Sequence, residues 1–238
     1  MARHKRIQTP GLLRHVMARG NGRMRIFRED TDYRKVLYVL GDIVDTYDIE
    51  CWDYCVMPTH YHLALCPRKE NFSLAMQRLN GNFGTWWNPA HTTIGHVFQG
   101  RFKDQIVQRE GYLRALCRYI ARNPVRAKLV EDPADWPWSG YAAIAGLRPN
   151  PGFLISDPIL KQFGDGDADV LQVRYRQHVL GLPADDDEAL EERLRSKERV
   201  LGDRAFKRLV DEGGAGTANM EPGGRPSIDT DSGRLMPL

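Results

Sequence analysis

Four side chains in two short segments have the types and the spacing for phosphodiester chemistry. The first segment reads Met57-Pro58-Thr59-His60-Tyr61-His62. A strand would place His60 and His62 on one face, because alternate strand residues point the same way. Two imidazoles side by side can hold a metal ion, but a solvent-exposed pair, or two histidines hydrogen-bonded at a sheet edge, would have the same pattern.

The second segment, residues 118–127, predicts the end of a helix. Tyr119 borders its apolar stripe, and Asn123 lies one turn further along on the same side. A tyrosine with a carboxamide one turn away and arginines beside it can attack a phosphodiester. The alternative is a tyrosine that packs at the border of the core, followed by an Asn-Pro pair that ends the helix.

The surrounding sequence predicts the elements that must position these groups. Apolar periodicity and turn signals predict strands at residues 12–19, 49–57, 60–66 and 95–108 and helices at 30–47, 72–87 and 111–123. Asp30 or Thr31 is expected to cap the first helix. The order is that of an α+β, ferredoxin-like (split βαβ) antiparallel sheet with helices on one face, and the opposite face would be free to bind a ligand.

The C-terminal third predicts a different kind of structure. Amphipathic helices are expected at residues 168–180, 187–197 and 203–211. The last residues are rich in Gly, Pro, Ser and Asp and are almost without apolar side chains. We therefore expect a domain over residues 1–145, a small helical extension over 146–211 and a disordered tail over 212–238.

Charge divides the 238 residues in the same way. Residues 1–148 hold 22 Lys and Arg against 14 Asp and Glu, whereas the remainder holds 12 against 17. Basic residues concentrate in 1–28 and 101–128, as expected for a polyanionic partner such as nucleic acid, although a solvated basic surface has the same composition. The candidate DNA contacts are Arg3, Lys5, Arg6, Arg14, Arg19, Arg23, Arg101, Lys103, Arg118, Arg122 and Arg126.

Composition excludes several other classes of protein. With 42% hydrophobic and 27% charged residues the chain is globular, and no apolar run reaches the 18 residues of a membrane span. The four cysteines include one C-x₃-C pair without a second pair, which favours small buried thiols over a zinc knuckle or disulfides. The basic N-terminal segment has no apolar signal-peptide core, so we expect a cytoplasmic protein.

Four blocks of sequence, taken together, resemble a known family. They are residues 15–21 (HVMARGN), 54–63 (YCVMPTHYHL), 99–103 (QGRFK), and 119–127 (YIARNPVRA) with Trp138-Ser139. In this order they resemble the REP-associated tyrosine transposases, a branch of the single-tyrosine HUH transposases. The resemblance covers residues 11–145, with a weaker similarity in the extension. Two positions differ from insertion-sequence relatives: Tyr61 replaces an aliphatic residue, and Asn123 stands in place of Gln.

The resemblance implies a mechanism and a substrate. His60, His62 and the carboxamide of Asn123 would hold one Mg²⁺ or Mn²⁺, while Tyr119 attacks phosphorus to leave a 5′-phosphotyrosine and a free 3′-OH. The expected partner is single-stranded hairpin DNA of the REP palindrome type, with Trp86, Trp87 and Phe98 as candidates to stack on bases. The alternative for Trp86 and Trp87 is a helix end packed on the sheet, and we expect it for one of the two. A cytoplasmic, nucleoid-associated monomer is expected, and a dimer is the alternative because insertion-sequence relatives exchange the tyrosine helix.

Two other functions compete with this interpretation. A non-catalytic single-stranded nucleic-acid-binding module on the same sheet explains the charge and the aromatics, but leaves the histidine pair and Tyr119 unused. A metal-dependent phosphoesterase that activates water uses the histidines but gives Tyr119 no role.

Overall fold

The computed structural model describes residues 6–181, 185–196 and 198–213, and the side chains of 185–188 are not described. Arg3, Lys5 and residues 214–238 of the expected tail therefore lie outside the described residues. The strands of the described chain are β1 (Arg14–Arg19), β2 (Ile49–Met57), β3 (His60–Pro67), β4 (Lys103–Val107) and β5 (Val200–Leu201). They form one sheet in the order β2-β3-β1-β4-β5.

The sheet is built on the β2–β3 hairpin. Pro58 and Thr59 join the two strands, so that Met57 pairs with His60 in antiparallel register. β1 pairs antiparallel with β3 on one side and with β4 on the other. The short β5 adds to β4 in parallel and brings the C-terminal extension onto the sheet.

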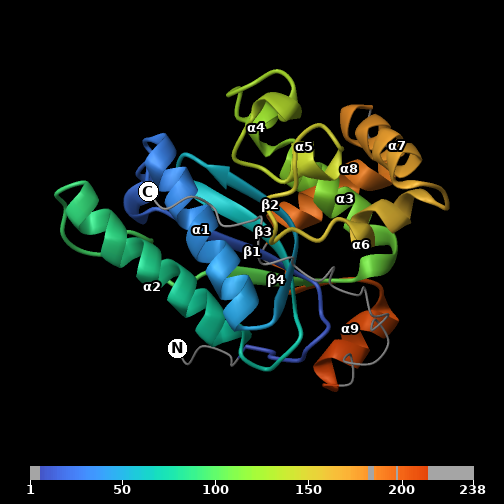
Figure 1. Ribbon diagram of the computed structural model, residues 1–238. Helices are drawn as coiled ribbons and strands as arrows, with labels where there is room; N and C mark the ends of the chain where they lie inside the picture. The colour runs from blue at the N-terminus through green and yellow to red at the C-terminus, as the bar shows by residue number, and fades with distance from the viewer. Residues whose placement is uncertain (1–5, 182–184, 197, 214–238) are drawn as a thin grey trace.

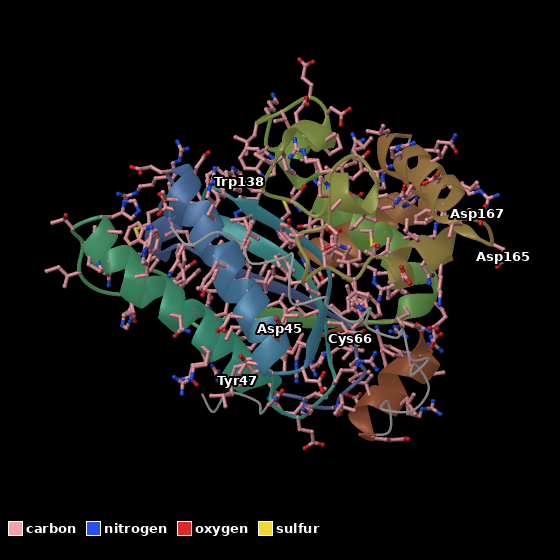
Figure 2. All side chains as sticks on the ribbon, viewed as in Figure 1. Asp45, Tyr47, Cys66, Trp138, Asp165 and Asp167 are labelled. Atoms are coloured by element: carbon pink, nitrogen blue, oxygen red, sulfur yellow. The ribbon has the colours of Figure 1, made fainter. Side chains whose placement is uncertain are left out.

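One face of the sheet is covered by α1 (Asp30–Thr46) and α2 (Phe72–Ala90). Figure 1 shows the two helices side by side in one layer. Tyr61 points to this face, since its hydroxyl donates to Asn80 Oδ1 of α2 at 2.6 Å. At the N-terminal end of α1, Trp138 stacks on Tyr33 with ring centroids 4.7 Å apart. Asp45 and Tyr47 mark the opposite end of this helix (Figure 2).

The opposite face is covered by α3 (Arg109–Ala121), which packs on β2, α7 and α8. The expectation that this face is free is wrong, because Tyr119 of α3 lies against histidines of β1 and β3. The helices that follow α3 in the chain are α4 (Asn123–Arg126), α5 (Tyr141–Ile144), α6 (Asp157–Leu160), α7 (Ala168–Leu180), α8 (Asp185–Arg195) and α9 (Arg204–Asp211). Of these, α4, α6, α7 and α8 pack on α3, whereas α9 lies apart beside β5 (Figure 1). Short 3-10 turns lie at Asn21–Arg23, Pro133–Asp135 and Lys161–Phe163.

The extension shares its interior with the sheet. Tyr175 and Val179 of α7, Leu194 of α8 and Leu201 of β5 are buried in the same apolar cluster as the strands. Ile106 N donates to Arg199 O at 2.8 Å, which fixes the extension along the edge of β4. Among the described residues, no helix has the length and apolarity needed to cross a bilayer.

The expected fold class is confirmed, and the differences lie at element ends. β2 and α7 have the predicted bounds. Glu29 rather than Asp30 or Thr31 caps α1, in a reciprocal capping box with Asp32. Residues 95–108 are a loop with one bridge from Phe98 to Gly20, and only β4 is regular strand. α3 ends at Ala121, before Pro124, which lacks the N–H that an uninterrupted helix would need.

Candidate active site

Two imidazoles lie at the start of β3 on the face covered by α3. The rings of His60 and His62 have centroids 4.9 Å apart and are nearly perpendicular. Each ring uses its Nδ1 in a hydrogen bond, at 2.8 Å with Thr59 Oγ1 for His60 and at 2.9 Å with His15 Nε2 for His62. The Nε2 atom of each ring is therefore the nitrogen left for a ligand, and the predicted same-face placement is confirmed.

Tyr119 reaches the same place from α3. Its ring contacts the His62 ring edge-on with centroids 5.5 Å apart, and it contacts His15 at 5.6 Å. The apolar stripe of α3 sets this position, since Leu116 and Ile120 are buried against the sheet while Tyr119 at the border keeps 7% of its surface exposed. The structure thus brings the predicted nucleophile and the histidine pair together within one chain.

Burial keeps the imidazoles neutral. Burial lowers the pKa of His15 and of His60 to about 4, and it lowers the pKa of His62 well below its ordinary value. Neighbouring positive charge from Arg19 acts in the same direction on both His60 and His62. At neutral pH both rings of the pair therefore present lone pairs, as metal ligation requires.

The charge around Tyr119 comes from α4 and α8. Arg126 lies over the tyrosine ring, 4.4 Å from its centroid, and donates to Glu191 Oε2 at 2.7 Å. Arg195 also faces the ring at 6.0 Å. Burial raises the pKa of the Tyr119 phenol, Arg126 and Arg195 lower it, and Glu191 raises it. The two guanidinium groups stabilise the phenolate, and Glu191 offsets part of that effect.

Asn123 lies one turn beyond Tyr119, as predicted. Its Nδ2 donates to the Tyr119 carbonyl at 2.9 Å. The amide nitrogen is used within the helix junction, so Oδ1 is the atom that Asn123 can offer to a cation.

The histidine pair does not by itself select a metal ion. Within the described residues, no cluster of three or more His, Cys, Asp or Glu side chains could hold a metal ion. Two imidazoles alone favour Zn²⁺, Ni²⁺ or Cu²⁺ over Mg²⁺, so a Mg²⁺ or Mn²⁺ ion at His60 and His62 would need oxygen ligands from an amide such as Asn123, from water or from substrate phosphate.

His15 and Glu191 belong to the site but were missed by sequence reasoning. His15 is part of the first motif block, yet only the pairing of β1 with β3 shows that it lies beside His62. Glu191 carries no motif, and the packing of α8 on α3 brings it to Arg126.

Two of the predicted DNA contacts are wrong because their side chains are buried. Arg118, 2% exposed, donates to the carbonyls of His178, Val179 and Gly181 at the end of α7. Arg14 lies between the Phe72 ring and Asp104, with no exposed surface. Both arginines hold the fold together, so neither is available to phosphate.

The remaining candidates divide into bonded and exposed groups. Arg6 is paired with Asp104, Arg122 donates to Val179 O, and Arg126 is paired with Glu191. The exposed candidates of the described chain are Arg19, Arg23, Arg101 and Lys103.

A groove of about 1180 Å³, lined by both polar and apolar side chains, runs beside the end of β1. Its walls are the outer side of α2, including Gln77 and Asn88, and residues 95–102. Gln99 N donates to Arg19 O at 2.9 Å, so the groove reaches the strand end that pairs with His60. Trp87 is buried in the core, as expected for one of the two tryptophans, and Trp86 is half-buried. Phe98, a candidate to stack on bases, is buried in the core instead.

Comparisons with known proteins agree with this geometry. Residues 9–123 match the family described as "Transposase IS200 like". A solved structure described as "Structure of the REP associates tyrosine transposase bound to a REP hairpin" is similar, with a TM-score of 0.53 and 21% sequence identity. The match covers 63% of this chain and 89% of the other. A search of curated proteins gave no match.

Residues 9–123 match the IS200-like transposase family, which confirms the predicted resemblance, and the chain shares its fold with the solved REP-associated tyrosine transposase. The histidine–tyrosine site lies within the matched region, since His60, His62 and Tyr119 all fall between residues 9 and 123.

Proposed function

We propose that this protein is a single-stranded DNA transposase and endonuclease that cleaves and rejoins hairpin DNA through a 5′-phosphotyrosine at Tyr119. The observation that carries the proposal is the contact of the Tyr119 ring with His62, whose neighbour His60 presents a second imidazole. Neither a binding module nor a water-activating phosphoesterase needs a tyrosine at that position.

The covalent step exchanges one phosphate ester for another. The Tyr119 oxygen forms a bond to phosphorus as it loses its proton, and the bond from phosphorus to the 3′ oxygen breaks, with that oxygen taking up a proton. Burial raises the pKa of the phenol, and the positive charges of Arg126 and Arg195 oppose that rise and so favour the nucleophilic form. The released 3′-OH can attack the phosphotyrosine in reverse, which rejoins DNA without an external energy source.

His60 and His62, with Asn123 Oδ1 as a third donor, would hold Mg²⁺ or Mn²⁺. Such an ion supplies polarisation of the scissile phosphate and stabilisation of developing negative charge.

The DNA would approach along the groove beside α2. The exposed Arg101 lines this groove, and the exposed Arg19 is bonded through its carbonyl to Gln99, another lining residue. The amide side chains of the groove can hydrogen-bond to base edges. The similar solved structure is bound to a REP hairpin, which supports a hairpin of the same type as the substrate here.

The site supports action by a monomer. Tyr119 contacts His15 and His62 of its own chain, so no exchange of the tyrosine helix is needed to complete it. With DNA as substrate, we place the protein in the cytoplasm, associated with the nucleoid.

A labelled hairpin oligonucleotide with single-stranded flanks, incubated with the protein and Mn²⁺, tests the proposal on a denaturing gel. We expect a covalent protein–DNA adduct that is lost in Tyr119→Phe. Cleavage without an adduct would instead support a phosphoesterase. Binding with neither cleavage nor adduct would support a non-catalytic module.

A further inference from the structure

His62 is held by two buried polar side chains that have no role in the steps above. His15 Nε2 lies 2.9 Å from His62 Nδ1, and His15 Nδ1 lies 3.1 Å from Gln105 Oε1. The three side chains, which we call the imidazole network, point to one face of β3, β1 and β4. Their exposed fractions are 2%, 1% and 6%.

The donor and the acceptor of each hydrogen bond can be assigned by starting from Gln105, the member of the network furthest from His62. Gln105 Nε2 lies 2.9 Å from the carbonyl oxygen of Glu198, in the segment that leads to β5, and within 3.5 Å of two other carbonyls. Carbonyl oxygens only accept, so the amide nitrogen must face them and Oε1 must face His15. Gln105 Oε1 also only accepts, so the proton of His15 is on Nδ1.

The position of the proton on His15 also determines which nitrogen of His62 is protonated. His15 is 1% exposed, and its hydrogen-bond partners among the described residues, Gln105 and His62, are uncharged, so it is neutral and its Nε2 carries only a lone pair. His62 Nδ1, 2.9 Å away, must be the donor. A neutral His62 protonated on Nδ1 has a free lone pair on Nε2.

We infer that His15 and Gln105 are positioning residues that fix His62 in the tautomer whose Nε2 is ready to coordinate a metal ion. The inference rests on the proposed metal site and adds to it a link with the C-terminal extension, since the Glu198 carbonyl orients Gln105. His60 is held differently. Its partner is the Thr59 hydroxyl, which can donate or accept and so fixes neither tautomer.

The inference is tested first on metal-free protein. Correlation of ring nitrogens with ring protons by ¹⁵N NMR reports which nitrogen of His62 is protonated. We expect the Nδ1-protonated form in the wild type, and a shift towards the Nε2-protonated form in His15→Phe. A wild-type His62 protonated on Nε2 would overturn the inference, whatever the protein does to DNA.

Metal affinity is the second readout. Loss of a hydrogen-bond partner of a metal-ligating histidine typically weakens metal binding about 10- to 100-fold. We expect this loss of Mn²⁺ affinity, measured by electron paramagnetic resonance titration, in His15→Phe. Gln105→Met, which keeps the side-chain length but removes the acceptor, should show a smaller loss in the same direction.

The matched control is Gln108→Leu. Gln108 also joins β4 to the extension, through Asp203, but it does not touch His15. Its Mn²⁺ affinity should stay within about twofold of wild type, since it lies outside the metal's hydrogen-bonded surroundings. Folded His15→Phe and Gln105→Met proteins with wild-type Mn²⁺ affinity would contradict the inference. Failure of the wild type to bind Mn²⁺ would contradict the proposed metal site. The NMR measurement on metal-free protein would then decide by itself whether His15 and Gln105 fix the tautomer of His62.

Discussion

The two faces of the sheet are buried in different ways. Under α1 and α2 the strands present mainly apolar and aromatic side chains. The two polar exceptions named above have their own partners: Asn80 accepts from the Tyr61 hydroxyl, and Asp104 pairs with Arg14 beside Phe72. Under α3 the same strands present His15, His62 and Asp53, all nearly fully buried.

This difference separates the fold from the site. Apolar packing under α1 and α2 needs no particular partner beyond shape, whereas buried polar groups under α3 each need a hydrogen-bond partner. The extension supplies several of these: the Glu198 carbonyl for Gln105, the α7 carbonyls for Arg118, and Glu191 for Arg126. The extension is therefore part of the catalytic side of the molecule.

The difference between the two faces is tested most directly by changing Tyr61 and His62, adjacent residues that point to opposite faces. His62→Gln should reduce DNA cleavage at least about 100-fold, because metal-derived charge stabilisation is worth several kcal/mol. Tyr61→Phe should leave cleavage within about twofold and lower the free energy of unfolding by about 1 kcal/mol, the value of one hydrogen bond. Single-turnover cleavage assays and urea unfolding measure both. Equal losses of cleavage in the two variants would remove the distinction between the faces.

Glu191→Gln should cause the largest loss of stability among polar changes on the α3 side. Glu191 lies 3.5 Å from Arg118 Nε and 2.7 Å from Arg126. Removing one partner of a buried ion pair costs about 3 kcal/mol, because a buried charge loses its compensation. Urea unfolding measures the loss. Glu192→Gln, at the exposed neighbouring position, is the control and should change stability by less than about 0.5 kcal/mol.

Asp53→Asn should stabilise the protein, increasingly so at higher pH. Asp53 Oδ2 has no hydrogen-bond partner among the described residues, and burial raises the pKa of this carboxyl well above its ordinary value. The stability that the neutral carboxyl provides is complete below the unfolded-state pKa, near 4, and is lost as the pH rises through the folded-state value.

The amide that replaces this carboxyl cannot ionise, so the loss should disappear in the variant. Because a pKa difference of one unit between the folded and unfolded states is worth about 1.4 kcal/mol, and burial raises the pKa of Asp53 well above its ordinary value, we expect a gain of more than about 1 kcal/mol at pH 8 and almost none at pH 4. Thermal unfolding across that range measures it, with the exposed Asp42→Asn as control. A gain that is independent of pH would show that Asp53 is not the titrating group.

The smallest expected effect distinguishes exposed arginines near the groove from an exposed arginine on α9. Arg19→Gln and Arg101→Gln should each lower the slope of log affinity against log salt by about 1, the value for one phosphate contact. Arg204→Gln, an exposed change on α9, should leave the slope unchanged. Fluorescence anisotropy of a labelled hairpin across a salt series measures the slopes. A slope that falls equally in all three variants would mean that the groove beside β1 does not guide the DNA.

The sequence predicts the features that depend on neighbouring residues better than the contacts between elements that are distant in the chain. The two-residue repeat of a strand predicts that His60 and His62 share a face, and helical spacing predicts Asn123 one turn beyond Tyr119. Both predictions succeed because they depend only on neighbouring residues. His15 could not be assigned a role from sequence, since its contact with His62 depends on strand register. The prediction of Arg118 as a DNA contact is wrong because nothing near it in sequence shows that the end of α7 covers it.

The most direct test of the account is the identity of the residue that becomes joined to DNA. The adduct formed with a hairpin oligonucleotide and Mn²⁺ can be digested with trypsin and nuclease and its linked peptide sequenced by mass spectrometry. Cleavage after Arg118 and Arg122 would release residues 119–122. We predict a nucleotide on Tyr119 of that peptide, and none in Tyr119→Phe. A nucleotide on any other residue, or an adduct that persists in Tyr119→Phe, would contradict the assignment of Tyr119 as the nucleophile.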